Sequence, residues 1–416
     1  MDLTGRTHVV DRRRSRGMAA DELRRHNLST VLERLHLLGP RSRSELAAVT
    51  GLNRSTIADL IGELTDLGLV DEGPGATSTG PGRPSLVVRA RPTGAIAVAI
   101  EIAVDSIAVA AVGLGGHVFN QERIARPRDR TGPADTITDL VPLIRPLLDS
   151  LPPDHRIAGV GVSVAGITRR GDGIVRLGPN LGWSEVRLGR LVGDALGIDT
   201  LVLVANEADL GALGEFRRGL YPGVRDLVYV QGEVGIGVGV IADGRPLVGT
   251  AGYAGEAGHM KVNPDGRTCR CGGSGCWETE AGEAALLHLM NTPPATGLAT
   301  VEAIESRAST GDPDVLQAIA GIGWWLGLGI GNLINIFNPE IVVLGGMYHR
   351  LFPFIEAATI EAVRRSALQA PAELVSIVRS GLGVNAGLIG AGEAALNRVI
   401  ADPAGQRLTV AGPLRA

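Results

Sequence analysis

The chain has 416 residues, which is too long for one compact core and predicts two or three domains. Hydrophobic residues make up 44% of the chain and charged residues 20%, without a long low-complexity tract, which excludes a wholly disordered protein. Only three cysteines occur, an odd number confined to residues 269–276, so the sequence argues against a disulfide framework and raises the question of a metal site.

Charge is distributed unevenly along the chain. Residues 1–91 contain 14 arginines, no lysine and 11 acidic residues, a net charge of +3, whereas the whole chain carries −4. This excess favours a polyanionic partner for the first 91 residues. A GC-rich genome is a plainer reason for the many arginines, because Lys261 is the only lysine. Residues 1–20 are predicted to form a basic, disordered arm without the apolar core of a secretion signal, so the expected compartment is the cytoplasm.

Three short helices are predicted after this arm. Apolar residues recur at helical spacing over residues 27–38. Ser42 and Glu45 form the S-x-x-E pattern of a capping box at the start of a second helix, and Gly51 suits its end. Asn53 is a suitable cap for a third helix that follows almost at once. The tight turn between the second and third helices predicts a helix-turn-helix.

A helix-turn-helix reads DNA with the N-terminal end of its last helix in the major groove. Here a turn-rich segment between two short strands follows that helix, which is the order of a winged helix. We therefore predict that residues 21–91 bind double-stranded DNA. An arginine can pair with a guanine in the major groove, and an arginine at the wing tip suits the minor groove. The expected DNA contacts are Arg54, Ser55, Thr56, Asp59 and Arg83. The plainer alternative is that the three amphipathic helices simply pack together.

Alternating strand and helix patterns after Ala95 predict an α/β fold. The candidate strands spread over roughly 300 residues, so two lobes around a cleft are expected, at residues 92–205 and 206–416. The longest apolar run, residues 321–337, contains five glycines and two asparagines, which predicts a buried helix and no membrane partner. The strands are predicted at residues 96–102, 107–112, 157–164, 201–204, 227–231 and 341–344.

One histidine and all the cysteines of the chain gather in a short, glycine-rich stretch. His259, Cys269, Cys271 and Cys276 supply an imidazole and three thiols, which are the donors of a tetrahedral Zn²⁺ site. Four protein ligands leave no open position, so the zinc is expected to be structural. Chance clustering is the alternative, and it would have to bring every cysteine of the chain to one loop beside a histidine.

The same stretch contains the patterns GEAGH and CRCGGSGC, within residues 228–280. These patterns closely resemble the signature of the ROK family, which groups repressors with sugar kinases, and the resemblance covers roughly the whole chain after Ala95. It implies an actin-like, ribonuclease-H-like duplicated fold, with a sugar bound between the two lobes and a zinc loop beside the sugar.

The resemblance also implies which residues hold the sugar. Asn206 and Glu207 stand where the family has a sugar-binding asparagine and a catalytic aspartate, and His259 is both a sugar and a zinc ligand. Without the motif, Glu207 and Glu278 would be ordinary surface acids. Carboxylates and amides independently suit a polyol, because each fixes a hydroxyl through hydrogen bonds. The implied sugar-binding set is Gly166, Asn180, Asn206, Glu207, Glu256, His259 and Glu278.

Three departures from the kinase pattern bear on enzyme activity. The family's kinases begin with a D-x-G-G-T phosphate loop, whose glycines let backbone amides approach ATP, but residues 101–105 read EIAVD. The second phosphate loop is usually G-T-G-x-G, whereas residues 233–237 read EVGIG. At the base position, Glu207 adds a methylene that displaces the carboxylate. Acids and bulk at both loops predict that ATP binding is lost.

The family contains repressors and kinases, so the fold alone does not decide the function. The DNA-binding domain and the altered loops favour a regulator of sugar metabolism genes without enzyme activity, and most family regulators are repressors. A bifunctional DNA-binding sugar kinase is the alternative, and a protein-interaction scaffold would leave the sugar residues without a purpose. The expected partners are an operator in double-stranded DNA, a sugar effector, and further copies in a homodimer or homotetramer.

Overall fold

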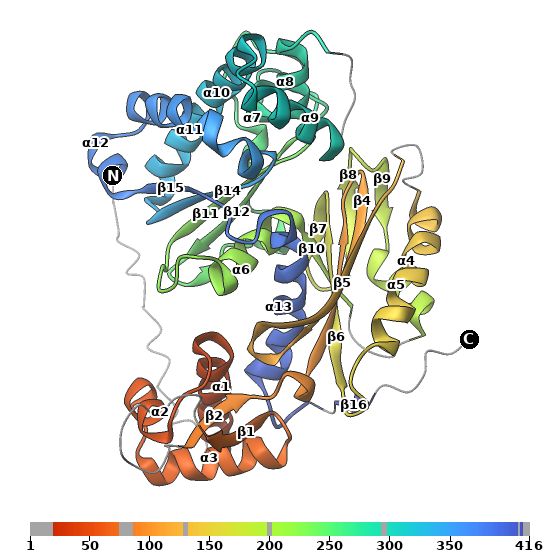
Figure 1. Ribbon diagram of the computed structural model, residues 1–416, viewed down its shortest axis with the longest axis vertical. Coiled ribbons are helices and arrows are strands. Elements are labelled where there is room, and N and C mark those ends of the chain that lie inside the picture. Colours follow the sequence, from red (N-terminus) through yellow and green to blue (C-terminus); the bar gives the residue numbers. More distant parts are fainter. Residues whose placement is uncertain are drawn as a thin grey trace, which may run out of the picture.

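The computed structural model describes residues 20–74, 86–127, 132–197, 202–292, 298–406 and 408–410. Figure 1 shows a small, mainly helical domain at one end of the molecule and two α/β lobes beyond it. Arg83 and residues 1–19 of the predicted basic arm lie outside the described residues. The N-terminal domain consists of α1 (Ala20–Leu38), α2 (Arg43–Thr50), α3 (Arg54–Asp66), β1 (Val70–Pro74) and β2 (Leu86–Ala90).

The three predicted helices of this domain are confirmed together with their caps. The Ser42 hydroxyl accepts a hydrogen bond from the Glu45 amide, and the Glu45 carboxylate accepts one from the Ser42 amide, which is the reciprocal pair of a capping box. Gly51 ends α2 with a left-handed φ of 71°. The Asn53 side chain accepts a hydrogen bond within the first turn of α3. α1 begins earlier than predicted, at Ala20, because its first turns are polar and show no apolar periodicity.

The first lobe is built on a sheet with the strand order β10-β6-β3-β4-β5. Its central strand alternates β-branched residues with alanines. Ile96, Val98 and Ile100 pack against the helices α4 (Pro133–Asp149) and α5 (Leu188–Leu196). The small residues Ala97 and Ala99 face α13 (Ala386–Ala401), which can therefore approach closely. The strands are β3 (Ile96–Ile102), β4 (Ser106–Gly113), β5 (His117–Ala125), β6 (Arg156–Val164) and β10 (Val202–Asn206), with a smaller sheet of β7 (Ile167–Arg169), β8 (Ile174–Gly178) and β9 (Trp183–Val186).

The second lobe repeats this topology. Its sheet has the order β15-β14-β11-β12-β13, in which the first three strands along the chain are antiparallel neighbours and the next two are parallel, as in the first lobe. Two sheets of the same topology indicate a duplicated fold. The strands are β11 (Leu227–Gly232), β12 (Ile236–Ala242), β13 (Arg245–Pro246), β14 (Ile341–Gly346) and β15 (Ser376–Arg379).

Helices cover both faces of the second sheet. α6 (Glu207–Arg218) packs on one face, where Ala208 and Ala212 contact Tyr229 in one apolar cluster. The opposite face is covered by a layer of helices, which Figure 1 shows at the far end of the molecule from the N-terminal domain. These helices are α7 (Trp277–Ala281), α8 (Glu283–Leu289), α9 (Leu298–Ser309), α10 (Pro313–Phe337) and α11 (Met347–Ser366), and α12 (Gln369–Leu374) follows them.

α10 contains the apolar run that was predicted to be a buried helix. In the described part of the chain it is the one helix whose length and hydropathy would suit a membrane span. Its side chains instead belong to the apolar core of the second lobe, together with those of α7 and α11. Gly327 lies so close to α11 that a Cβ atom would collide with it. The burial of α10 therefore accounts for its apolar sequence.

The last described segment returns to the first lobe. α13 packs on the first sheet, and β16 (Thr409–Val410) pairs with β6. The prediction had placed all residues from 206 onward in the second lobe, so the packing differs from it for residues 386–410. No local pattern gives this placement, because α13 is apolar on several faces and also packs against α6. α6 and α13 lie together between the two sheets (Figure 1).

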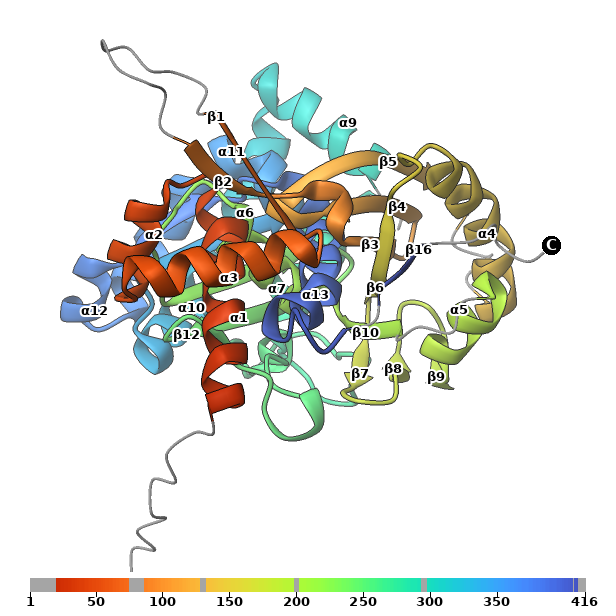
Figure 2. The ribbon, with the colours of Figure 1, turned by 90° about the horizontal axis from the view of Figure 1, so that it is seen from below.

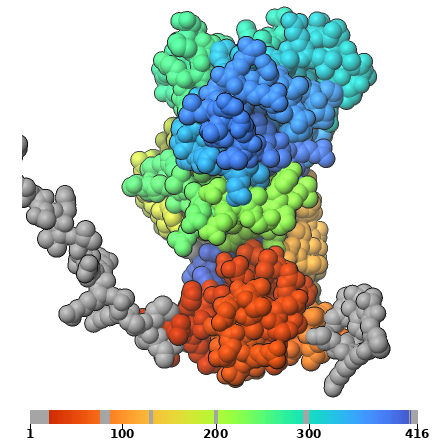
Figure 3. Space-filling view, turned by 90° about the vertical axis from the view of Figure 1, so that its left-hand side faces the viewer, coloured from red at the N-terminus to blue at the C-terminus, as the bar shows by residue number. Residues whose placement is uncertain are grey.

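The N-terminal domain is docked on the first lobe and does not hang from a linker. Leucines of α1 and α3 share one apolar cluster with residues of β3 and α13. Figure 3 shows the domain, coloured red to orange, in direct contact with the rest of the molecule. A shift within the first lobe or α13 can therefore reach the N-terminal domain through packed side chains.

Candidate functional site

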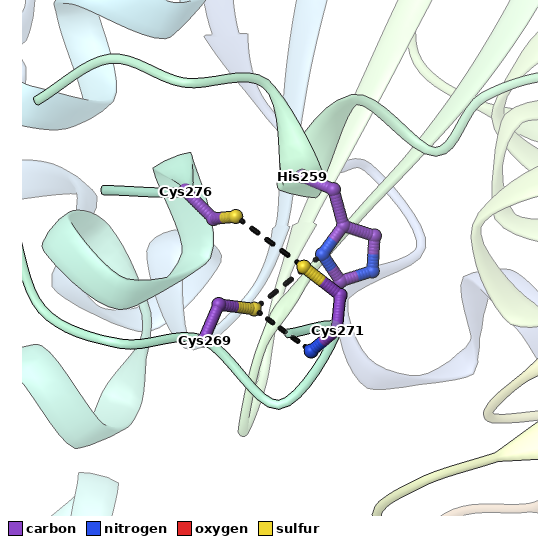
Figure 4. A group of neighbouring side chains, drawn as sticks. All are labelled: His259, Cys269, Cys271 and Cys276. Carbon is purple, nitrogen blue, oxygen red and sulfur yellow. Dashed lines mark hydrogen bonds between the residues drawn. The ribbon is translucent and has the colours of Figure 1, made fainter. Parts of the chain in front are cut away.

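The four predicted metal ligands come together in the second lobe. His259 ends the short 3-10 turn η4 (Ala257–His259), Cys269 and Cys271 lie in the loop that follows, and Cys276 directly precedes α7. The donor atoms of the four side chains lie within 4.8 Å of one another. Figure 4 shows the side chains gathered around a common centre.

The spacing of these donor atoms fits a tetrahedral zinc ion. The Sγ atoms of Cys271 and Cys276 are 3.7 Å apart, and Sγ of Cys269 is 3.6 Å from Nδ1 of His259. Zinc–sulfur bonds of about 2.3 Å place neighbouring donors of a tetrahedron about 3.8 Å apart. Gly275 has a φ of 66° and no room for a Cβ atom, so only glycine allows the loop to close around so small a site.

His259 connects the metal cluster to the predicted sugar site. Its Nδ1 lies beside Cys269, whereas its Nε2 is 4.0 Å from the carboxylate of Glu256. Glu278 lies on the other side, with its carboxylate 3.7 Å from Nδ1. The side chains of Glu256, His259 and Glu278 are 40%, 35% and 21% exposed. The structure thus brings together three of the predicted sugar-binding residues, and a ligand can reach them.

A second group of predicted sugar residues lies at the start of α6. Asn206 ends β10 and caps α6, because its Oδ1 accepts a hydrogen bond from the Ala208 amide at 2.8 Å. Its Nδ2 donates to the carbonyl of Gly166 at 3.0 Å. Gly166 has a φ of 152°, and a Cβ atom there would come within 2.7 Å of the Leu177 carbonyl oxygen, so this position requires glycine. One Nδ2 hydrogen of Asn206 remains for a sugar hydroxyl.

Asp209 belongs to this site although the sequence did not predict it. It lies three residues after Asn206, on the same face of α6. Burial, and secondly the charge of Glu256, raise the pKa of Asp209 to about 7. The helical spacing from Asn206 was the available signal, but the burial that raises the pKa comes from distant parts of the chain.

Asn180 lies in the first lobe, between β8 and β9, and contacts the metal loop of the second lobe. Arg270, which stands between two of the cysteines, donates a hydrogen bond from Nη1 to Oδ1 of Asn180 at 2.7 Å. The resemblance places Asn180 in the loop that closes over the sugar. The two lobes therefore meet directly at this edge of the site.

Glu207 faces a different environment from the other predicted sugar residues. Burial, followed by the charges of Glu233, Glu101 and Asp105, raises the pKa of Glu207 well above its usual value. Burial and the neighbouring acids raise the pKa of Glu233 to about 7. Burial also raises the pKa of Glu101, although an ion pair with Arg123 at 2.5 Å opposes this. The raised pKa favours the protonated form of Glu207.

An open cavity lies between the lobes, and both predicted phosphate-loop segments contribute to its lining. Val234 of the second segment packs against the apolar core of the first lobe, which includes Val104 of the first segment. The amides of Ala103 and Glu233 donate to carbonyls of their own loops at 3.0 and 2.9 Å. The cavity lining thus includes carboxylates and two backbone amides that are already hydrogen-bonded.

The predicted DNA contacts that the structure describes share one face. Arg54, Ser55 and Asp59 are exposed in the first turns of α3, and Thr56 is half-buried. The Ser55 hydroxyl donates to the side chain of Asn53 at 2.7 Å. Figure 2 shows α3 in front, on the outer face of the molecule, where no other described element covers it.

The base of the wing is fixed to the helix-turn-helix. Arg43 of α2 donates from Nε and Nη2 to the two carboxylate oxygens of Glu72 in β1, at 2.8 and 2.6 Å. β1 and β2 pair as antiparallel strands over five residue pairs. This bidentate pair ties β1 to α2. The predicted contact Arg83 lies outside the described residues.

Comparison with known proteins identifies the family. The ROK family profile matches residues 97–398. The chain belongs to the ROK family. A putative xylose repressor of Caldicellulosiruptor sp. (strain Rt8B.4) is 33% identical, over 76% of this chain and 81% of its own. A glucokinase of Streptomyces coelicolor is 28% identical, over 60% of this chain and 81% of its own.

A solved ROK family transcriptional regulator, described as a homolog of the Escherichia coli MLC protein, has the same overall structure. Its TM-score is 0.73 at 26% identity, and the match covers 91% of this chain and 97% of that one. A coverage of 91% is more than residues 97–398 of the family profile alone provide, and more than the 60% of this chain that the glucokinase match covers. The predicted fold, an N-terminal winged helix-turn-helix followed by a two-lobed, actin-like ROK domain, is confirmed.

Proposed function

We propose that this ROK protein is a transcriptional repressor that binds operator DNA through its winged helix and responds to a sugar bound between its lobes. The joint presence of both sites carries the proposal. An exposed recognition helix stands at one end, and Glu256, His259 and Glu278 remain accessible in the cleft. One apolar cluster joins the N-terminal domain to the first lobe. Such a protein acts in the cytoplasm, where its DNA is.

D-Xylose is the effector to test first. Two relatives that are each 33% identical to this chain are named a putative xylose repressor and a xylose repressor. The exposed carboxylates and the free Nδ2 hydrogen of Asn206 suit the hydroxyls of a pyranose ring. Xylopyranose also lacks the exocyclic hydroxymethyl group of glucose. It therefore has no hydroxyl there for a kinase to phosphorylate, and a protein that only senses xylose needs no ATP beside that position. D-Glucose and N-acetyl-D-glucosamine are the other sugars for the same titration.

The donor geometry supports one structural Zn²⁺ per chain, held by His259, Cys269, Cys271 and Cys276. Bound zinc would neutralise the thiolates and fix the loop, and would supply no reaction chemistry. His259 would ligate through Nδ1, which leaves Nε2 directed toward Glu256 and the sugar.

ATP-dependent phosphotransfer is not part of the proposal. Asp105 and Glu233 place carboxylates in the cavity where a polyphosphate would have to lie, and the raised pKa of Glu207 favours its protonated form, which cannot act as a base. The likeness to glucokinases and the carboxyl group of Glu207 favour the second candidate, a bifunctional DNA-binding sugar kinase. The two candidates differ in whether ATP binds.

Calorimetry on the full-length, zinc-loaded protein separates the candidates. We expect a saturable heat with one of the three sugars and no heat with magnesium ATP up to millimolar concentration. ATP binding in the micromolar range, or phosphorylation of any sugar at about 1 s⁻¹ or faster, would replace the regulator with the bifunctional protein. If no sugar changes the melting temperature, the scaffold class becomes the better description.

DNA binding is tested with two arginine variants. The operator probe is a duplex selected from a random pool by the full-length protein, and affinity is measured by fluorescence anisotropy at fixed salt. Arg54→Ala should weaken binding by about 1–3 kcal/mol and relax base preference if Arg54 reads a guanine. Arg83→Ala should weaken binding with less effect on that preference. Unchanged affinity in both variants would refute the assignment of the recognition helix and the wing.

The proposed assembly is a homodimer or a homotetramer. A palindromic operator has two half-sites about one helical turn or a multiple apart, so it requires at least two winged helices. Light scattering of the free protein and of its operator complex measures the number of chains. A monomer in both states would contradict this part of the proposal.

A further inference from the structure

Four polar side chains form a buried group where α1, α6 and α13 meet. His36, Arg217, Arg218 and Glu393 are here called the junction cluster. The side chains of His36 and Glu393 have no exposed surface, and those of Arg217 and Arg218 are 13% and 15% exposed. Charged groups are rarely buried so completely unless each is paired. The junction cluster lies between the DNA-binding domain and the lobes, and neither the sugar site nor the metal site uses it.

Glu393 is the centre of the junction cluster. Its carboxylate accepts hydrogen bonds from Nε2 of His36 at 2.8 Å, from Nε of Arg218 at 2.6 Å and from Nη1 of Arg217 at 3.3 Å. Arg218 also donates from Nη1 to the carbonyls of His36 and Gly115, at 3.0 and 3.3 Å. One guanidinium of α6 thus contacts the backbone near the end of α1 directly.

The protonation states of the junction cluster follow from its contacts. The Gly115 amide donates to Nδ1 of His36 at 3.0 Å, and Nε2 contacts both the Glu393 carboxylate at 2.8 Å and Nη2 of Arg218. Burial lowers the pKa of His36 and, with the two arginine charges, outweighs the opposing effect of Glu393, so the ring is neutral. Burial would raise the pKa of Glu393, but the bond from His36 and the arginine charges outweigh it and lower that pKa. Glu393 therefore stays ionised.

α6 runs from the sugar site to the junction cluster. Asn206 caps its N-terminal end, Asp209 lies near Glu256 in its first turn, and Arg218 is its last residue. Twelve residues of α-helix span about 18 Å. α6 packs on the second sheet through Ala208 and Ala212 and on α13 through Leu210 and Leu213, so it links the two lobes.

The DNA-binding domain has a separate attachment to the first lobe. Arg156 of β6 donates from Nη2 to the carbonyls of Leu67 and Gly68, at 2.7 and 3.0 Å, directly after α3. Arg91 and Asp154 form an ion pair beside it. The end of the recognition helix is thus held by the first sheet, whereas the end of α1 is also held by α6, which links the two lobes. A shift of α6 relative to the first sheet would therefore turn the domain.

We propose that Arg218 and Glu393 are the positioning residues that transmit sugar occupancy from the N-terminal end of α6 to α1 of the DNA-binding domain. The proposal rests on the sugar-responsive function proposed above. Both residues lie away from sugar and DNA, so they act through α1. Variants of these two residues should still bind sugar and DNA, but sugar binding should no longer change the affinity for DNA.

The test compares Arg218→Lys and Glu393→Gln with wild type in three measurements on the full-length, zinc-loaded protein. These are the D-xylose Kd by calorimetry, the Kd for the selected duplex by anisotropy, and the ratio of the duplex Kd with and without saturating xylose. A lysine keeps the charge but cannot reach Glu393 and two carbonyls together. The matched control is Arg365→Lys, whose arginine pairs with Glu361 on the surface of α11.

Wild type and the control should show the same xylose-dependent change in duplex Kd, about 5- to 150-fold. Arg218→Lys should reduce that change to less than about threefold, with the xylose Kd and the xylose-free duplex Kd each within about threefold of wild type. A full response in a folded Arg218→Lys protein would overturn the proposal, as would wild type that binds xylose without any change in duplex Kd. Glu393→Gln is the second variant, read in the same way.

Hydrogen exchange gives a result that needs no sugar. Arg218→Lys should speed amide exchange at the C-terminal ends of α1 and α6 by about tenfold, with no change in the metal loop, because it removes contacts that hold these ends together. If xylose, glucose and N-acetylglucosamine all fail to bind wild type, the proposed effector function fails. The hydrogen-exchange rates of Arg218→Lys then test by themselves whether Arg218 links α6 to α1. Unchanged amide exchange at the end of α1 would overturn that link.

Discussion

The two sides of the interlobe cleft carry the same residue type at different degrees of burial. On the metal side, Glu256 and Glu278 flank His259, and their side chains are 40% and 21% exposed. On the cavity side, burial and mutual repulsion raise the pKa of three glutamates above the usual value. These are Glu101, Glu207 and Glu233.

Under the proposed function, this difference would let a sugar site persist without an ATP site. A partly exposed carboxylate can accept hydrogen bonds from the hydroxyls of a ligand. A buried carboxyl group among other acids favours its protonated form, and it repels phosphate when it ionises. The two sets come from different loops, so substitutions at residues 101–105 and 233–234 leave the GEAGH and cysteine patterns intact.

Loss of a metal ligand should have the largest effect on the metal side. Cys271→Ser replaces a thiolate by a poor zinc ligand and leaves the other two thiolates without their cation. We expect zinc to fall from one ion per chain to almost none, and the free energy of unfolding to fall by about 4 kcal/mol or more. Metal analysis and denaturant titration measure both. Ser274→Ala, in the same loop, should keep the metal, and a fully stable, metal-free wild type would contradict the prediction.

Removing an exposed carboxylate from the same side should affect the ligand and leave the fold unchanged. Glu256→Ala deletes a charge-assisted hydrogen bond to the sugar, which is expected to cost about 1.5–3 kcal/mol, or more than tenfold in sugar Kd. Zinc content and the duplex Kd without sugar should stay at wild-type values, because Glu256 is neither a metal ligand nor part of the DNA-binding domain. Glu361→Ala on the surface of α11 is the control. A variant with unchanged sugar Kd would remove Glu256 from the site.

The sequence predicted the features that depend on residues close together in the chain. The capping box of Ser42 and Glu45 and the strand at residues 96–102 depend on neighbours in the sequence, and both are confirmed. The metal ligands also lie close together in the sequence. His36 and Glu393 are 357 residues apart, so no spacing could have predicted their contact. The pKa of Asp209 depends on burial by other segments, which a sequence pattern does not contain. The sugar set came from the family resemblance.

The smallest expected effect concerns the cavity side and its pH dependence. Glu233 has a pKa of about 7 in the folded protein and about 4.5 when unfolded, so between these values the native state binds more protons. Its contribution to stability is therefore present at low pH and is lost as the pH rises from about 4.5 to about 7. Glu207, whose pKa is also raised, contributes with the same sign. Glu393, whose pKa is lowered, contributes to the pH dependence of stability only at more acidic pH.

Glu233→Gln should therefore flatten the loss of stability with rising pH. The amide keeps the shape of the side chain and can still accept the hydrogen bond from Gln231, which is 2.7 Å long in the native protein. We expect the variant to gain about 1–2 kcal/mol relative to wild type between pH 5.5 and 7.5, measured by urea denaturation at saturating zinc. The free energy of unfolding of the control variant Glu361→Gln should change with pH as that of wild type does. If the two curves for Glu233→Gln and wild type are also parallel, Glu233 is ionised throughout this range, and the protonated state of the cavity side is wrong.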